Sequence, residues 1–438
     1  MDDIRDTRLR AEARAGDALA QFRLGMAYLQ QEKPSRAMRW LQSSASAGHP
    51  QAALTLGRIF LSGAVGTPDP ANALAMFENA ARAGSAQGLY EVARLKCCGW
   101  GVPFAPSEGI DSLRLAARSA HPEALRVLGV ILGQSEDENI RDTLASACLL
   151  RAAALGDPIA AHLAGLRIVA GRGAHPDTTR AAGLFALAGQ KFEVSRRIAA
   201  GLGLDVEARS TATRHMPTGP DLPELRPVRW PDPPLPEPEQ LNDSPRIACY
   251  RGLLDRELCD YLRLRAEPDL LPSHTIDPDK GASIAVSLRT SSETNLLRTL
   301  RDPATGWIER RLAKAAGVAL DHTEPVAILR YFPGEEYKPH YDSLNLEHQK
   351  PALRALGQRL HTLIVYLDSV AAGGATAFPK IGEHGLTVAA EAGKALFFDN
   401  CDADGAPDPR SLHAGTPVEK GEKWVATLWC RANAVPMR

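Results

Sequence analysis

Two side chains that can bind a metal ion lie two positions apart in the segment YFPGEEYKPHYDS, residues 331–343. They are His340 and Asp342, and they follow an apolar stretch and a glycine turn. Residues i and i+2 of a β-strand point to the same face, so both side chains can reach one ion. A third ligand must come from elsewhere, and His413, shortly before the last apolar run, is the best candidate among the histidines of this half.

Two histidines and one carboxylate form the facial triad of non-haem Fe(II) enzymes, although zinc binds the same residue types. Lys423 favours iron, because it follows His413 on a strand predicted to run into a barrel. A buried lysine is costly unless it meets an anion. A dicarboxylate that binds the iron through its other end would supply that anion, which indicates 2-oxoglutarate.

The second half of the chain has the pattern of a β-domain that could hold these side chains. Short apolar runs separated by Gly and Pro occupy residues 246–250, 325–331, 360–367, 394–399 and 423–430. They predict strands of a closed or double-sheet barrel. One helix is predicted after Asp255 as N-cap, with Leu258, Tyr261 and Leu262 on its buried face.

Several segments of this half resemble one enzyme family. RYFPGEEYKPHYDS, RLHTLIVYLDSVAAGGATAFP, KALFFDN and SLHAGTPVEKGEKWVATLW occur in the order typical of the prolyl 4-hydroxylase group of Fe(II)/2-oxoglutarate dioxygenases. YRGLLDRELCDYL and LPSHTIDPDKGASIAVSLRTSSETNL resemble the group as well, so the resemblance spans residues 246–434. It implies a double-stranded β-helix, or jelly-roll, that uses Fe(II), 2-oxoglutarate and O2, with ascorbate in support.

The resemblance also implies roles for single residues. His340, Asp342 and His413 match the iron ligands, Lys423 matches the residue that binds the distal carboxylate of 2-oxoglutarate, and Tyr331 and Thr376 match its hydroxyl donors. Arg289, Arg359 and Trp429 match positions beside the peptide-substrate groove. For the two arginines a structural ion pair, and for Trp429 a core position, are alternatives.

One departure from the family concerns the last strand. Members often carry His two residues after the strand's tryptophan, whereas Cys430 and Arg431 follow Trp429 here. The substrate residue is therefore less firmly implied than hydroxylation itself. The intact Asp342 argues against the halogenating relatives, which lack this carboxylate.

The first half contains a repeated phrase at intervals of 32 to 36 residues. Its anchor positions are Gly16, Gly48, Gly84, Ala120, Gly156 and Gly189. Each unit predicts a helical hairpin, with Ala20, Leu24, Ala27 and Tyr28 on one apolar face and Ala37, Trp40, Leu41 and Ala45 on another. Stacked hairpins form a solenoid, and the segments at residues 56–84 and 98–120 resemble Sel1-like repeats, relatives of tetratricopeptide repeats.

A proline-rich segment separates the halves, with ten prolines between residues 216 and 245. Such a segment favours an extended, semi-rigid connection. We therefore predict an α+β multidomain chain: a helical repeat domain at 1–200, a linker at 201–244 and a dioxygenase domain at 245–438.

Composition limits the partners. Lys and Arg total 51 against 52 Asp and Glu, so the chain has no net field for nucleic acid. No apolar run approaches the roughly 18 residues of a membrane helix, and residues 1–6 are charged rather than signal-like. Seven scattered cysteines, with Cys97 and Cys98 expected to be buried thiols, suit a reducing cytoplasm.

We predict a hydroxylase of a peptidyl residue, foremost proline, whose repeats bind the protein or peptide substrate. The alternatives are a hydroxylase of another residue or of a free amino acid, and a non-catalytic adaptor. The repeats could also only scaffold or dimerise the second half. An adaptor would be expected to lose at least one of His340, Asp342, His413 and Lys423, and all four are present.

Overall fold

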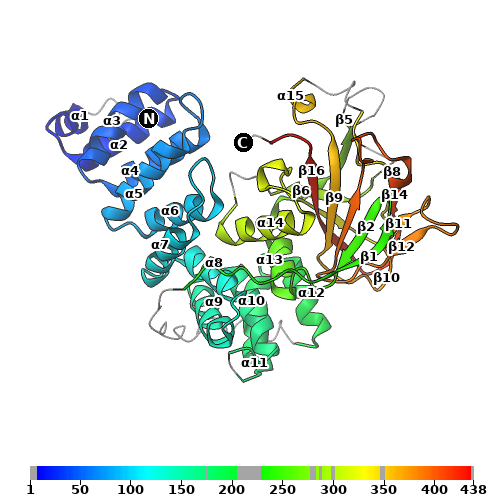
Figure 1. Ribbon diagram of the computed structural model, residues 1–438. Helices are drawn as coiled ribbons and strands as arrows, with labels where there is room; N and C mark the ends of the chain where they lie inside the picture. The colour runs from blue at the N-terminus through cyan, green and yellow to red at the C-terminus, as the bar shows by residue number, and fades with distance from the viewer. Residues whose placement is uncertain are drawn as a thin grey trace. The chain divides into compact units, whose positions relative to one another are not determined.

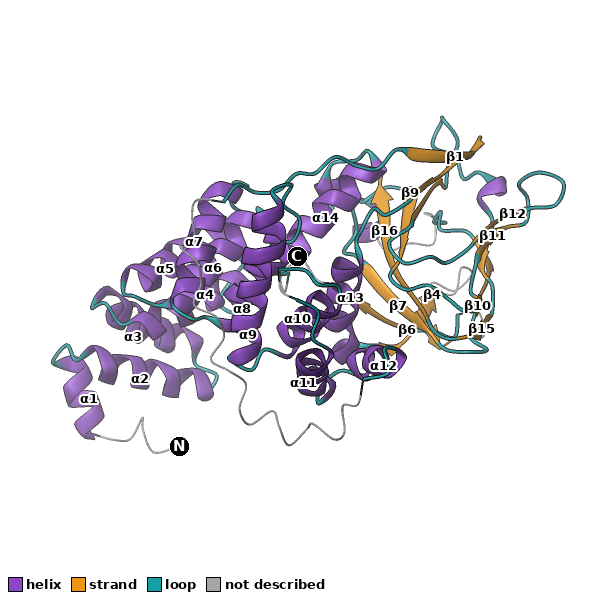
Figure 2. Cartoon of the chain, turned by 90° about the horizontal axis from the view of Figure 1, so that it is seen from below, coloured by secondary structure: helices purple, strands orange, loops and turns teal. Residues whose placement is uncertain are grey.

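The computed structural model describes residues 7–173, 175–204, 228–276, 283–285, 289–296, 301–345 and 351–435. The chain divides into two compact units, one containing the helices up to Leu184 and one that begins at Phe185 and contains the strands. Figures 1 and 2 show the helical and the strand-rich parts. The predicted α+β class is confirmed.

The first part of the chain is a series of helical hairpins. Its helices are α1 Thr7–Arg14, α2 Ala18–Gln30, α3 Pro34–Ser46, α4 Pro50–Ser62, α5 Pro70–Arg82, α6 Ala86–Cys98, α7 Pro106–Arg118, α8 Pro122–Leu132, a π-helical turn Asn139–Leu144, α9 Ala145–Ala154, α10 Pro158–Val169, α11 Thr178–Gly189 and α12 Glu193–Gly201. The predicted apolar faces of the first unit are buried, except for Trp40, which is only partly buried.

The repeated glycine ends the second helix of each hairpin in the left-handed conformation. The φ angles of Gly16, Gly48, Gly84 and Gly156 are 99, 85, 83 and 89°. Glycine adopts this conformation without a steric cost, which explains the period of the sequence. Ala120 takes the same role at φ 54°, whereas Gly189 is the last residue of α11.

The described residues of the second part of the chain form two main antiparallel sheets and two two-stranded ones, β10-β15 and β4-β5. The eight-stranded sheet has the order β1-β2-β13-β9-β16-β7-β6-β3 and the four-stranded sheet the order β12-β11-β14-β8. The strands are β1 Pro238–Asp243, β2 Arg246–Tyr250, β3 Leu271–Pro272, β4 His274–Ile276, β5 Ser283–Ala285, β6 Ser292–Asn295, β7 Ala327–Tyr331, β8 Tyr337–His340, β9 Arg359–Tyr366, β10 Ala372–Gly373, β11 Thr376–Phe378, β12 Leu386–Val388, β13 Ala395–Asp399, β14 His413–Gly415, β15 Val418–Lys420 and β16 Lys423–Arg431. The five predicted strands and the double-sheet architecture are confirmed.

The described residues of this part also form the α-helices α13 Arg256–Ala266, α14 Pro303–Ala316 and the short α15 Pro351–Arg354. The Asp255 side chain caps α13 by accepting from the backbone N–H of Leu258, as predicted. Tyr250 on β2 donates its hydroxyl to the Ala315 carbonyl of α14 at 2.9 Å, which fixes that helix against the sheet. None of the described helices is both long and apolar enough to cross a membrane.

The connection between the predicted domains differs from a plain linker where it is described. Much of it, residues 205–227, lies outside the described residues. Pro238–Asp243, within the predicted linker 201–244, forms edge strand β1 beside β2. Helix α12, which begins within the predicted repeat domain 1–200, belongs to the second unit, where Glu193 contacts Arg330 of β7 and Glu267.

Candidate metal centre and cosubstrate pocket

The three predicted metal ligands form one cluster. The potential ligand atoms of His340, Asp342 and His413 all lie within 4.8 Å of one another. His413 on β14 is the direct cross-strand partner of His340 on β8. This pairing confirms the prediction that a neighbouring strand returns His413 to the His-x-Asp pair.

Asp342 reaches the cluster by another route than the one predicted. Strand β8 ends at His340, so Asp342 lies in the bend that follows and not on the same strand face. Thr362 on β9 donates its hydroxyl to Asp342 Oδ2 at 2.8 Å, and Asn400 donates to the Thr362 oxygen at 2.9 Å. A buried chain of hydrogen bonds thus sets the orientation of the carboxylate.

Both histidines present the same ring nitrogen to the cluster. Nδ1 of His340 bonds the Lys338 carbonyl and Nδ1 of His413 bonds the Ser411 carbonyl, each at 2.9 Å. A carbonyl only accepts, so Nδ1 carries the proton and Nε2 is left as a lone-pair donor. The two Nε2 atoms each lie 3.7 Å from an Asp342 oxygen.

The protonation states suit a divalent cation. Burial, reinforced by His413, lowers the pKa of His340 to about 3. Burial alone would raise the pKa of Asp342, but His413 and His340 hold it below its usual value. Neutral imidazoles and a carboxylate are the forms that bind metal. The residues present therefore fit an Fe(II) ion.

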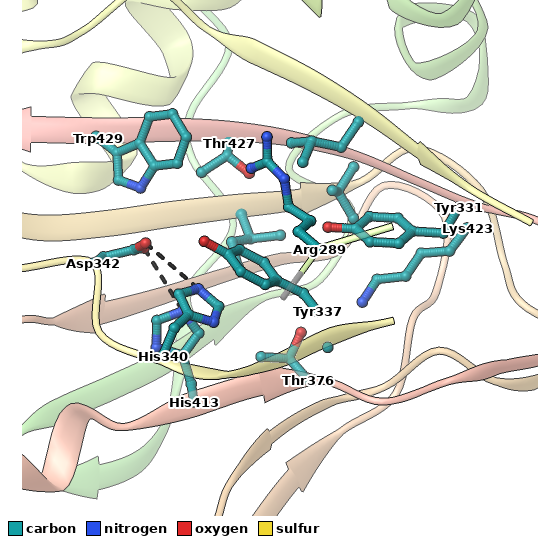
Figure 3. A pocket seen from close by; sticks show the side chains of 14 residues that line it. Arg289, Tyr331, Tyr337, His340, Asp342, Thr376, His413, Lys423, Thr427 and Trp429 are labelled. Atoms are coloured by element: carbon teal, nitrogen blue, oxygen red, sulfur yellow. Dashed lines mark ion pairs between the residues drawn. The ribbon is translucent and has the colours of Figure 1, made fainter. Parts of the chain in front are cut away.

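Lys423 lies in the same pocket as the cluster, toward its other end (Figure 3). Its side chain is buried, and burial lowers its pKa to about 8. Its Nζ lies 5.4 and 5.9 Å from the rings of Tyr331 and Tyr366. No carboxylate among the described residues forms an ion pair with it.

Tyr331 and Thr376 line this end of the pocket as well. Tyr331 on β7 pairs directly with Lys423 on β16. Thr376 comes from β11 of the other sheet, and its hydroxyl accepts from Tyr366 at 2.7 Å, so its own proton can be donated. The predicted hydroxyl donors and the lysine therefore converge from both sheets.

The three predicted substrate residues divide into two groups. Arg289 and Trp429 line the pocket, whereas Arg359 does not. Arg359 is bound by both carboxylate oxygens of Glu324, at 2.7 and 2.9 Å, and its guanidinium lies 4.0 Å from the Trp429 ring centroid. Arg289 also forms an ion pair, with Glu293. Both arginines thus have the structural partners left open by the sequence.

Sequence reasoning did not single out several residues of the site. Tyr337 stacks on His340 at a centroid distance of 3.4 Å, and Thr362 and Asn400 orient Asp342. Period-two alternation along 359–366 places Thr362 with Tyr366 on one strand face, a signal that could have identified both. Asn400 lies directly after a strand and carried no such signal.

Comparison with known proteins identifies the second half. Residues 326–431 match the 2OG-Fe(II) oxygenase superfamily. The chain is 36% identical over 207 residues to probable prolyl 4-hydroxylase 3 of Arabidopsis thaliana, covering 44% of this chain and 71% of that protein. It is also 36% identical over 213 residues to prolyl 4-hydroxylase 1 of the same plant, covering 45% and 73%.

Two solved structures are each similar to a part of the chain. The viral collagen prolyl hydroxylase vCPH of Paramecium Bursaria Chlorella virus-1, in its 2OG complex, has 27% identity and a TM-score of 0.33, covering 42% of this chain and 96% of that chain. A Sel1 repeat protein of Oxalobacter formigenes has 22% identity and a TM-score of 0.39, covering 46% and 85%. From its sequence relatives, this chain belongs to the prolyl 4-hydroxylase family of the 2OG-Fe(II) oxygenase superfamily.

Proposed function

We propose that this protein hydroxylates a prolyl residue of a peptide or protein in a reaction that depends on Fe(II), 2-oxoglutarate and O2. The observation that carries the proposal is the buried Lys423 ammonium, which shares a pocket with the His340, Asp342 and His413 cluster. One dicarboxylate can satisfy both ends of such a pocket.

Each residue then has a definite task. His340, Asp342 and His413 would hold Fe(II), while Lys423, Tyr331 and Thr376 would bind the distal carboxylate of 2-oxoglutarate. Fe(II) and 2-oxoglutarate, when bound together, would supply the activation of O2 and the decarboxylation of 2-oxoglutarate to succinate. Thr362 and the two backbone carbonyls keep the ligands oriented, and Leu329, Ile364 and Val425 give the pocket apolar walls.

The substrate is proposed from the relatives and from the pocket wall. The matched relatives are named as prolyl 4-hydroxylases. The Trp429 indole N–H faces the pocket region and has no partner among the described residues, so it can donate to a peptide carbonyl. Recruitment of the substrate by the helical repeats, support by ascorbate and residence in a reducing cytoplasm complete the proposal. All seven cysteines are buried, which suits that compartment.

The test is hydroxylation of proline-containing peptides by the full chain with Fe(II) and 2-oxoglutarate. Mass spectrometry should find one added oxygen on proline and an equal amount of succinate. Asp342→Ala should abolish both while the circular dichroism spectrum stays unchanged, because two histidines alone hold the ion weakly. Oxygen found on lysine or asparagine would assign another substrate residue, and no turnover with any peptide would favour the adaptor.

A further inference from the structure

Strands β7 and β16 carry a cluster of charged side chains on the face opposite the one from which Tyr331 and Lys423 enter the pocket. Arg330 and Trp424 are direct cross-strand partners, one position along from the pair Tyr331 and Lys423. Arg330 donates to both oxygens of Glu422, at 3.1 and 2.9 Å, and the Trp424 indole donates to Glu422 at 3.1 Å. Because successive strand residues face opposite sides, this cluster lies behind the pocket wall.

Helix α12 completes the cluster from outside the sheets. Glu193, its first residue, accepts from Arg330 Nη2 at 2.8 Å. Arg197, one turn later, forms ion pairs with Glu193 at 2.6 Å and with Glu422. The side chains of Arg330 and Glu422 are each only 8% exposed, so this ion pair is screened less than a pair at an open surface. Figure 2 shows α12 beside β6 and β7.

A second contact fixes the same helix end. The Glu267 carboxylate, which follows α13, accepts from the backbone N–H groups of Glu193 and Val194 at 2.5 and 3.2 Å. The first N–H groups of a helix have no partner within the helix, and a carboxylate there also interacts favourably with the helix dipole. The start of α12 is thus held by two independent carboxylate contacts.

We propose that α12 positions the cosubstrate-binding pair. Glu193 holds Arg330, and Arg330 together with Glu422 fixes the adjacent backbone of β7 and β16, from which Tyr331 and Lys423 enter the pocket. Glu193 and Arg330 are therefore positioning residues and not catalytic ones. The inference rests on the proposed function, which assigns Lys423 to 2-oxoglutarate.

The variant Glu193→Gln in the full chain tests the inference, because it keeps the side-chain size and removes the charge that binds Arg330. The KM for 2-oxoglutarate in succinate release should rise about threefold to tenfold. The kcat at saturating 2-oxoglutarate and the Fe(II) affinity should stay unchanged. Arg330→Lys, which cannot bind both carboxylates in the same way, should shift KM in the same direction. Circular dichroism establishes first that each variant is folded.

The matched control is Glu12→Gln, which removes the exposed ion pair of Arg8 and Glu12 on α1 and should leave KM unchanged. An unchanged KM in both Glu193→Gln and Arg330→Lys would overturn the inference. An equal weakening of Fe(II) and 2-oxoglutarate binding would also overturn it, since that is the result of a general loss of stability. Absence of 2-oxoglutarate turnover in the unaltered chain would instead contradict the proposed function, and the inference with it.

Discussion

Among the described residues, Lys423 is a buried cation with a clear energetic need for an anionic ligand. Burial lowers its pKa to about 8, from an ordinary value of about 10.4. A shift of this size corresponds to about 3 kcal/mol against the charged form. A carboxylate placed opposite the ammonium would offset that cost, so ligand binding and protonation of Lys423 are coupled.

This coupling predicts a pH dependence. Below about pH 8 Lys423 is protonated and binds the carboxylate; above it the proton is lost and affinity for 2-oxoglutarate falls as pH rises. Isothermal titration with Mn(II) in place of Fe(II), from pH 7 to pH 9.5, measures this directly. Lys423→Ala should bind about a hundredfold more weakly at pH 7, with little further change as pH rises. A parental affinity in Lys423→Ala would place the cosubstrate elsewhere.

Thr362 gives a second prediction at this scale. Thr362→Val keeps the shape of the side chain but removes the hydrogen bond to Asp342, so Fe(II) affinity should fall at least about tenfold. Thr362→Ser, which retains the hydroxyl, is the matched control and should bind iron like the parent. Metal titration under anaerobic conditions measures both. Equal affinities of all three chains would mean that the hydrogen bond does not orient the ligand.

The residues of the site were predictable to different degrees for physical reasons. His340, Asp342, His413 and Lys423 are the polar groups that the chemistry itself requires, so residue type and order were enough. Glu324 could not be predicted as the partner of Arg359, because that ion pair joins a loop to a strand 35 residues later. Long-range pairs of this kind depend on the three-dimensional fold.

At the scale of elements, the residue before the first helix of each hairpin caps that helix with its side chain. Asp17, His49, Ser85, His121 and Asp157 each accept a hydrogen bond from the backbone N–H three residues later. Such N-caps satisfy N–H groups that a helix cannot. A histidine accepts through Nδ1 only while that nitrogen carries no proton, so the cap at His121 depends on pH.

His121 allows this to be measured. Burial lowers its pKa below the ordinary value, so the unfolded chain binds the proton more tightly. The free energy of unfolding therefore falls as pH drops through about 6.5. His121→Ser, which copies the cap of the preceding hairpin, should make this acid-dependent loss smaller.

Urea unfolding at pH 7.5 and pH 5.5, followed by helical circular dichroism, gives the comparison. The variant also loses the contacts of His121 with Gln87 and Tyr90, so the difference between the two pH values is the relevant quantity. The exposed His384→Ser serves as control and should leave that difference as in the parent. If the free energy of unfolding changes equally between the two pH values in His121→Ser and in the parent, the cap stays formed in acid.

Periodicity predicted the hairpins and the five main strands, because each has one apolar face repeated along its length. It did not predict β1, since Pro238–Asp243 is polar and proline-containing and pairs along one edge only. It placed α12 with the repeats because α12 follows them in sequence. Glu193 of α12 forms an ion pair with Arg330 of β7, which is more than 130 residues away in the sequence. Periodicity carries no information on such a contact.

At the scale of the whole molecule, the division of the chain predicts where a catalytic fragment must begin. A fragment starting at Phe185 keeps α12 and the carbonyls of Pro233 and Pro234, to which Arg311 donates. A fragment starting at Leu235 loses them. Without peptide substrate, the Phe185 fragment should release succinate like the full chain. The Leu235 fragment should have a higher KM for 2-oxoglutarate in the same assay, and a lower Tm.

Neither fragment should hydroxylate a full-length target as efficiently as the full chain, if the repeats recruit it. Side-by-side assays of succinate release and target hydroxylation separate the two roles. Equal target hydroxylation by the Phe185 fragment and the full chain would remove recruitment. Equal KM values of the two fragments would remove the need for α12 and the Pro233–Pro234 segment.

The pairing of His413 with His340 also concerns the stability of the pocket itself. Strand β8 is an outer strand of the four-stranded sheet; it is joined to β14 on one side and by a single bridge from Tyr337 to Arg289 on the other. Outer strands open first in local fluctuations. An ion held by both histidines would join the two strands at that margin and slow amide hydrogen exchange along β8. Removal of the iron by a chelator should therefore loosen β8 and β14. Without the metal, these strands should become accessible to proteases before the rest of the domain unfolds.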